Sequence, residues 1–190
     1  MRVLPFDQDM VDRAKEWAES IGSLNRSIIS GEGNFAGRIG ELALAHYLGV
    51  EVEDHKDYDL IYKGDKIEVK TKRRSCAPLP DYDVSVAKTS GHQKADRYIF
   101  ISLQFSEKKF WGKPYAGKGR AGGAIYNGLE FVWLCGDMDV KEYFLKAKLW
   151  RKGDKDKSNN FHTQADMYNM KIKDLNETYN WYIRTAEIES

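Results

Sequence analysis

The sequence predicts an α/β domain. Two amphipathic helical patterns come first, several short strand patterns follow, and a further helix comes before the end of the chain; this mixed order is typical of an α/β protein. At 190 residues, the chain can bury the core of one domain without disulfide bonds. Neither a repeat nor a linker-like composition divides it. We therefore expect a single domain over residues 1–190.

The helices are predicted from apolar residues at helical spacing. Residues 7–21 place six of them on one side, namely Met10, Val11, Ala14, Trp17, Ala18 and Ile21. A polar, glycine-containing connection leads to a second helix, expected over residues 35–48 with Gly49 as its stop. A third helix is expected to begin near Asp139.

The strands are predicted from short apolar or alternating runs. We expect them over residues 58–62, 66–71, 83–87 and 98–103, with a turn or short helix over 89–96. The run 98–103 is continuously apolar, which is typical of a strand covered on both faces. Asn127-Gly128 predicts a hairpin between residues 124–126 and 129–134. A polar loop over 151–160, a strand over 170–172 and a short amphipathic segment over 181–183 complete the prediction.

The composition indicates a soluble globular protein. Hydrophobic residues make up 42% of the chain and charged residues 31%, and no apolar run has the length of a membrane span. The first residues carry acids where a secretory signal needs an unbroken apolar stretch. The two cysteines stand in unrelated contexts, which suits a reducing compartment. We expect a cytoplasmic protein without a membrane partner.

The net charge of +1 does not by itself indicate nucleic-acid binding. A prediction of such binding has to rest on local clusters of basic residues. Two local clusters are basic. The first consists of Lys70, Lys72, Arg73 and Arg74, and the second of Lys108, Lys109, Lys113, Lys118 and Arg120. Taken alone, the second cluster is best interpreted as a solvated loop.

The segment 58–70 places acidic side chains on one face of a predicted hairpin. Glu68 and Lys70 share a face because side chains alternate along a strand. With a two-residue turn at Lys63-Gly64, Asp59 lies directly opposite Glu68. A turn at Gly64-Asp65 would place Asp59 opposite Lys70 instead, still on the same face. Only a three-residue turn would separate the two carboxylates.

Facing carboxylates repel each other, and a divalent cation removes that repulsion. Mg²⁺ takes a few hard oxygen ligands and keeps several waters, so two or three carboxylates suffice. Lys70 supplies the positive charge that can position an attacking water or stabilise charge on a phosphate. The alternative interpretation is a surface hairpin with a cross-strand salt bridge between Asp59 and a lysine. A second E-x-K triplet at Glu107 has no acid placed across a hairpin from it, and we interpret it as surface.

Over residues 35–103, this arrangement resembles the PD-(D/E)xK nuclease superfamily. The resemblance rests on Gly40-Glu41 in a helix, Asp59, Glu68-Val69-Lys70, and the strand, short helix and apolar strand that follow. It implies a restriction-endonuclease-like core, in which a central mixed sheet is flanked by helices. It also implies phosphodiester hydrolysis with Mg²⁺ or Mn²⁺ as cofactor. One departure is Tyr58, which stands where the family has its proline.

The resemblance assigns roles residue by residue. Asp59, Glu68 and Lys70 would be catalytic, and the metal ligands would be Glu41, Asp59, Glu68 and the Val69 carbonyl. Phosphates of DNA would bind Lys72, Arg73 and Arg74, joined by Lys113, Lys118 and Arg120 of the second basic cluster. Gln93 resembles the glutamine of some exonuclease branches, and His92, because it is close to the predicted site, is a further candidate to support the metal ligands. Many relatives act as dimers, so a homodimer is compatible with the resemblance, as is a phage-encoded protein in a host cytoplasm.

Three other signals point to no separate function. The stretch 112–118 matches G-x-x-x-x-G-K, but Gly119 replaces the required Ser or Thr and no helix pattern follows, so no nucleotide cofactor is expected. The histidines and cysteines lack zinc spacing. Trp17, Trp133, Trp150 and Trp181 are expected in the core, whereas Trp111 stays open as a base-stacking residue.

The sequence therefore predicts a magnesium-dependent deoxyribonuclease, with endonuclease action expected. A catalytically inert nucleic-acid-binding or accessory protein on the same fold is the leading alternative. Binding alone has no need of two facing carboxylates, which argues against it. An enzyme acting on RNA or another phosphodiester is a third reading.

Overall fold

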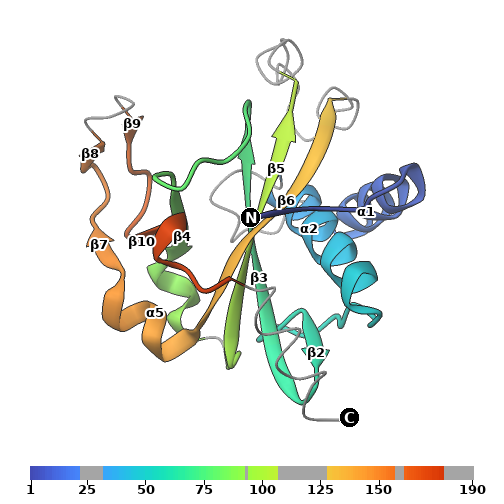
Figure 1. The fold of residues 1–190 in the computed structure, drawn as a ribbon, viewed down its shortest axis with the longest axis horizontal. Coiled ribbons are helices and arrows are strands. Elements are labelled where there is room, and N and C mark those ends of the chain that lie inside the picture. Colours follow the sequence, from blue (N-terminus) through green and yellow to red (C-terminus); the bar gives the residue numbers. More distant parts are fainter. Residues whose placement is uncertain (22–31, 93, 107–127, 157–160, 178–190) are drawn as a thin grey trace.

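The computed structural model describes residues 1–21, 32–92, 94–106, 128–156 and 161–177. Its α-helices are α1 (Gln8–Ile21), α2 (Glu32–Leu48) and α5 (Val140–Lys146), and two short 3-10 helices are η1 (Lys88–His92) and η2 (Ile172–Asp174) (Figure 1). No helix within the described ranges is long and apolar enough to cross a membrane.

A five-stranded mixed sheet forms the centre of the fold. Its strands, in spatial order, are β1 (Arg2–Leu4), β6 (Leu129–Asp139), β5 (Arg97–Phe105), β3 (Asp65–Arg74) and β2 (Leu60–Tyr62). β3 and β5 run parallel, and the other neighbours are antiparallel. A parallel pair needs a crossover connection, and here the crossover contains β4 (Asp83–Ala87) and η1.

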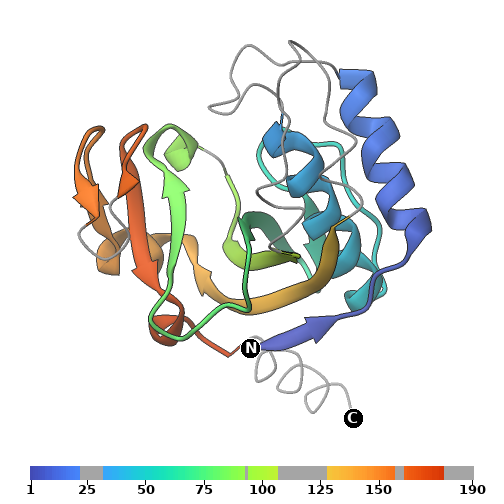
Figure 2. The same ribbon diagram turned by 90° about the horizontal axis from the view of Figure 1, so that it is seen from above.

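A second, three-stranded sheet lies to one side of the central sheet. It consists of β4, β10 (Met167–Lys171) and β7 (Lys148–Trp150), with β10 in the middle and antiparallel to both neighbours. A small ladder of β8 (Lys155–Asp156) and β9 (Phe161–His162) extends this part of the molecule. Figure 2 shows the second sheet on one side of the central strands and α1 and α2 on the other.

Two apolar clusters lie on opposite faces of the central sheet. The α1 and α2 side buries residues such as Ala14, Ile39, Leu60 and Ile99. The other side buries a cluster formed mainly by the central sheet, the small sheet and α5: Val84, Val86, Tyr98, Phe100, Cys135, Met138, Tyr143, Met170 and Ile172. β5 contributes to both clusters, which explains why its sequence is apolar throughout.

The predicted α/β class is confirmed, and most elements lie where the sequence placed them. The helices over 7–21 and 35–48 and the one beginning near Asp139 are present, the first two as Gln8–Ile21 and Glu32–Leu48. Gly49 stops α2 with a φ of 70°. The strand over 83–87 is present with the expected bounds.

Three parts of the prediction were wrong or incomplete. The resemblance implied a central mixed sheet flanked by helices; α1 and α2 cover one face, but the other is covered by the small sheet together with α5, because β4 pairs with β10 and not with the central strands. Residues 2–4 form a strand that was not predicted, and the predicted loop 151–160 contains β8. Residues 124–127 of the predicted hairpin and the segment 181–183 lie outside the described residues.

Candidate active site at the β2–β3 hairpin

The β2–β3 hairpin closes through the two-residue turn at Lys63-Gly64. Both residues have positive φ, 51° and 89° respectively, as a type I′ turn requires. Tyr62 then pairs with Asp65, and Leu60 with Ile67. This is the first of the three turns that the sequence left open, and the two that would have shifted the register or separated the carboxylates are excluded.

The register sorts the side chains onto two faces. Leu60, Tyr62, Ile67 and Val69 are buried in the cluster under α1 and α2. Glu68 lies on the opposite face of β3, next to Tyr98 of β5 in the parallel ladder. Lys70 follows Glu68 on that face, so the acid and the lysine lie together as predicted.

Asp59 departs from the predicted opposition to Glu68. Its N–H donates to the Ile67 carbonyl at 2.8 Å, so Asp59 and Leu60 both face Ile67, as in a β-bulge. The Asp59 carboxylate accepts a 2.7 Å hydrogen bond from the Val69 N–H. The prediction that Asp59 lies directly opposite Glu68 was therefore wrong. Because of the bulge, the Asp59 carboxylate lies against the backbone of Val69, between Glu68 and Lys70.

The Val69 carbonyl points toward the same edge. An N–H and a C=O of one residue point the same way in a strand, as Lys66 shows: its N–H donates to Asp96 Oδ2 and its carbonyl accepts from the Asp96 N–H. Val69, three residues on, directs both groups to the other side, where Asp59 lies. This carbonyl is therefore directed to the edge of β3 where the Asp59 carboxylate lies.

Glu68 and Lys70 form a close, largely buried ion pair. Glu68 Oε1 lies 2.8 Å from Lys70 Nζ, and the side chains keep only 9% and 15% of their exposure. The ammonium also lies 5.4 Å from the centre of the Tyr98 ring, within the range of a cation–π contact. Tyr98 is held by edge-on contacts with Tyr143 and Phe144, so Lys70 rests on a packed support.

Glu41 is brought to the hairpin by a close approach of α2 to β3. At Gly40, a Cβ would lie 2.2 Å from Thr71 Oγ1, so a larger residue does not fit without movement. Glu41 follows directly in the chain and binds Arg38 Nη1 at 3.1 Å. The same guanidinium nitrogen contacts Asp54 at 3.2 Å, and the guanidinium lies 4.7 Å above the Trp17 ring.

The three acids repel one another. Burial raises the pKa of Asp59 well above its usual value, and the charges of Glu41 and Glu68 raise it further, against the Val69 N–H and Lys70. Burial also raises the pKa of Glu41, with Glu68 adding to the rise and Arg38 opposing it. Burial and mutual repulsion therefore both disfavour the charged forms of Asp59 and Glu41.

This donor set fits a hard divalent cation that keeps most of its waters. Carboxylates of Asp59 and Glu68 and the Val69 carbonyl are oxygen ligands of the kind Mg²⁺ takes, and Glu41 adds a fourth oxygen source. As the side chains stand, no three acidic, His or Cys side chains within the described ranges form a close metal cage. Mg²⁺ is commonly held by one or two carboxylates, so such a cage is not required.

The basic residues of the first cluster divide between the faces of β3. Lys72 donates to the Asp83 carbonyl at 3.2 Å and approaches Ser85 Oγ at 3.4 Å. Arg74 binds the Asp83 carbonyl at 2.8 Å and Ser102 Oγ at 3.1 Å, so its guanidinium holds β4 against β3. Burial lowers the pKa of Arg74. Arg73 points to the face opposite Lys72 and Arg74.

Several predicted residues cannot be placed. Lys113, Lys118, Arg120 and Gln93 lie outside the described residues. His92 ends η1, and its side chain is also outside what the structure describes.

Sequence reasoning missed Arg38 and Tyr98. Arg38 precedes Glu41 by three residues, which places both on one helix face and was a usable signal. Tyr98 gave no such signal, because its position next to Glu68 depends on the parallel register of β3 and β5.

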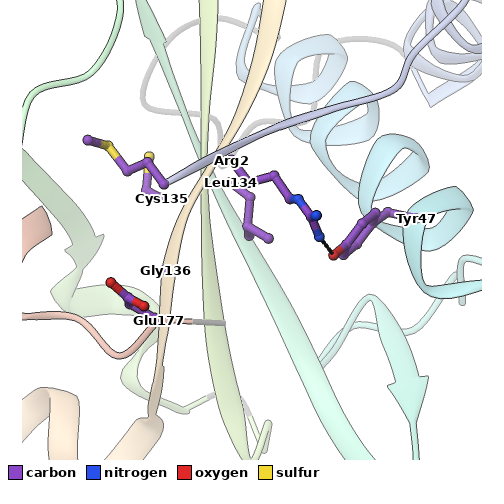
Figure 3. A pocket seen from close by; sticks show the side chains of 7 residues that line it. Arg2, Tyr47, Leu134, Cys135, Gly136 and Glu177 are labelled. Atoms are coloured by element: carbon purple, nitrogen blue, oxygen red, sulfur yellow. Dashed lines mark hydrogen bonds between the residues drawn. The ribbon is translucent and has the colours of Figure 1, made fainter. Parts of the chain in front are cut away.

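Two hollows in the surface are not lined by Asp59, Glu68 or Lys70. One of about 300 Å³ is lined by Met1, Arg2, Tyr47, Leu134, Cys135, Gly136 and Glu177. Figure 3 shows the Arg2 guanidinium bound to the Tyr47 hydroxyl beside it. The other, of about 370 Å³, lies on α1 and α2 and includes Trp17 and Arg38. The carboxylate site coincides with neither of these hollows.

Comparisons of the chain with protein-family models, curated proteins and solved structures found no match.

Proposed function

We propose that this protein is a metal-dependent DNA nuclease whose active site lies at the β2–β3 hairpin. The main support for this proposal is that Asp59, Glu68 and Lys70 lie together at one end of the hairpin, next to Glu41 of α2. Mutually repelling carboxylates with raised pKa values are costly unless they serve a purpose, and such groups gather at functional sites. The proposed core is of the restriction-endonuclease-like type.

The side chains have distinct roles in this proposal. Asp59, Glu68 and the Val69 carbonyl hold Mg²⁺ or Mn²⁺, and Glu41 assists. When bound, the ion supplies an acidified water and offsets charge on the phosphate. Lys70 is fixed by Glu68 and the Tyr98 ring, so its ammonium can orient a water or contact a phosphate oxygen. The Val69 N–H fixes the Asp59 carboxylate.

The experiment is cleavage of supercoiled and linear DNA with Mg²⁺, Mn²⁺ or a chelator. The wild type is expected to cut only with metal, and Glu68→Gln and Lys70→Ala are expected to abolish cutting. Lys15→Ala, at an exposed lysine on α1 outside both basic clusters, is the control and should cut normally. Supercoiled and linear DNA side by side distinguish nicking from degradation from the ends.

Two outcomes would contradict the proposal. Cutting that survives both site substitutions would place the activity elsewhere. A folded wild type that neither cuts DNA or RNA nor binds a divalent ion would favour the inert binding protein.

A further inference from the structure

A row of polar side chains crosses the small sheet at one register level. Ser85 of β4 pairs with Asn169 of β10, and Asn169 pairs with Lys148 of β7, so these three side chains lie side by side on one face. Lys72 of β3 approaches Ser85 Oγ at 3.4 Å and continues the row. We call Lys72, Ser85, Asn169 and Lys148 the polar row.

The polar row faces away from the apolar core. Its neighbours along the strands, Val84, Val86 and Met170, are buried against Tyr98 and Tyr143. Side chains alternate along a strand, so Ser85 and Asn169 point outward. Ser85 and Asn169 are half-buried and Lys148 is exposed; Asn169 Oδ1 is itself buried, without a hydrogen-bond partner among the described residues, so the row meets solvent mainly at Lys148.

Trp150 adds an aromatic side chain to this face. It stands two residues after Lys148 on β7 and pairs with Met167 of β10. Lys148 Nζ lies 5.6 Å from the centre of its ring, which confirms that both side chains share the face. The sequence placed Trp150 in the core, but it is half-buried and belongs to neither apolar cluster.

The charge of the face suits an anionic ligand. The acid at the next register level, Asp83, is paired with Lys171 at 2.9 Å and so adds little net charge. Lys72 and Lys148 add two positive charges at the two ends of the polar row. Lysines bind phosphates, and aromatic rings stack on bases. Proteins that bind single-stranded nucleic acid combine these two kinds of contact.

Lys72 connects the polar row with the candidate active site. Lys72 is the next residue after Lys70 on the same face of β3, about 7 Å farther along the strand. Two strand spacings, about 10 Å in all, then separate Ser85 from Lys148. A DNA strand that passes Lys70 can therefore reach Lys148 and Trp150 within a few nucleotides.

We propose that the polar row and Trp150 bind a single-stranded segment of DNA adjoining the cleavage site. Lys72 and Lys148 contact its phosphates, and Trp150 stacks on one base. The preferred substrate is then a duplex with a single-stranded tail or branch. This inference rests on the proposed nuclease function for the identity of the substrate.

Binding in chelator tests the interface separately from cleavage. Fluorescence anisotropy would compare a blunt duplex with the same duplex carrying a single-stranded tail, over a range of salt concentrations. The wild type is expected to favour the tailed duplex. Lys148→Ala should reduce the salt slope for the tailed duplex by about 0.7, the value for one phosphate contact on a single strand. Trp150→Leu should weaken binding of the tailed duplex roughly 5- to 160-fold, the range for one stacked base, and Trp150→Phe should retain most of that binding.

Lys15→Ala on α1 is the matched control, because Lys15 is an exposed lysine on the helix layer across the central sheet. It should leave the tail preference unchanged. A wild type without tail preference, or Lys148→Ala and Trp150→Leu variants that bind like the wild type, would overturn the interface. A tail preference that these variants abolish, in a protein that never cleaves DNA, would support the interface and overturn the nuclease function.

Discussion

Gly40 marks the point where α2 touches β3, and replacing it tests how Glu41 reaches the site. A Cβ at this position would lie 2.2 Å from Thr71 Oγ1. Gly40→Ala should therefore force the helix and the strand apart, at a cost of about 1–3 kcal/mol for overpacking. The better helix propensity of alanine returns about 1 kcal/mol, so the net loss of stability is expected to be roughly 0–2 kcal/mol.

Gly37→Ala is the matched control in the same helix. A Cβ there would meet Glu41 Oε1 at 3.6 Å, an ordinary contact. This variant should gain about 0.5–1 kcal/mol from helix propensity alone. The contrast between the two variants isolates the contact with β3 from the general effect of replacing glycine in a helix.

A double-mutant cycle supplies the decisive measurement. Thr71→Ala removes Oγ1, so Gly40→Ala should become neutral or stabilising in that background, with a coupling energy of about 1–3 kcal/mol. Urea unfolding gives the free energies of unfolding. In thermal melts, each kcal/mol of lost stability should lower the Tm by about 2–4 °C for a domain of this size. A tight contact between Gly40 and Thr71 is refuted if Gly40→Ala has the same effect in both backgrounds, or if it stabilises the wild type as much as Gly37→Ala does.

Three further predictions concern the charges of the site. Asp59→Asn should raise stability at neutral pH in chelator and abolish stabilisation by Mg²⁺. Because the folded pKa of Asp59 lies above its usual 3.8, the native state holds the proton more tightly. The wild type should therefore recover stability relative to the variant as pH falls through that folded pKa, and parallel melting curves over pH would contradict this. Lys70→Ala leaves Glu68, 7% exposed, without its ammonium partner, so it should cost up to the roughly 3–5 kcal/mol of a broken buried pair; Glu68→Gln in addition should restore most of it in urea unfolding. Tyr98 has its pKa raised to about 12 by burial and by Glu68, so wild-type stability should fall as pH rises from 10 to about 12. Tyr98→Phe should lessen that fall and leave the part that comes from Tyr143, whose pKa burial also raises; it should also gain about 1 kcal/mol at pH 7 because the Tyr98 hydroxyl is buried without a hydrogen-bond partner among the described residues. If the stability of Tyr98→Phe falls above pH 10 as steeply as that of the wild type, the raised pKa of Tyr98 is refuted.

Local chemistry made the hairpin predictable. Lys63-Gly64 can adopt the two positive φ angles of a tight turn, and the turn fixes the pairing of Leu60 with Ile67. From that pairing follow the buried face and the side on which Glu68 and Lys70 lie. The end of α2 could also be predicted from a local signal, because Gly49 adopts the positive φ that stops the helix.

Long-range pairing could not be predicted from the same signals. Val84 and Val86 alternate as in any half-buried strand, and nothing local tells that their partners are on β10 and not on the central sheet. The bulge at Asp59 was missed because it depends on the carboxylate taking the place of a backbone acceptor for Val69. Trp150 was wrongly predicted to lie in the core. A tryptophan on a strand fits either a covered or an open sheet face, and the sequence does not show which face of β7 is covered.

The crossover between β3 and β5 has a consequence for how the chain folds. β4 lies inside this crossover, but its partner β10 is made much later, so Val84 must wait for Met170 before its strand is paired. During synthesis from the ribosome, β4 is therefore an unprotected strand edge for as long as the C-terminal part is missing. Contacts between residues so distant in sequence close slowly, and unpaired edges in the meantime favour aggregation. We expect the small sheet to form last, so that the surface beside Lys70 is completed only after the central sheet and its helices are in place.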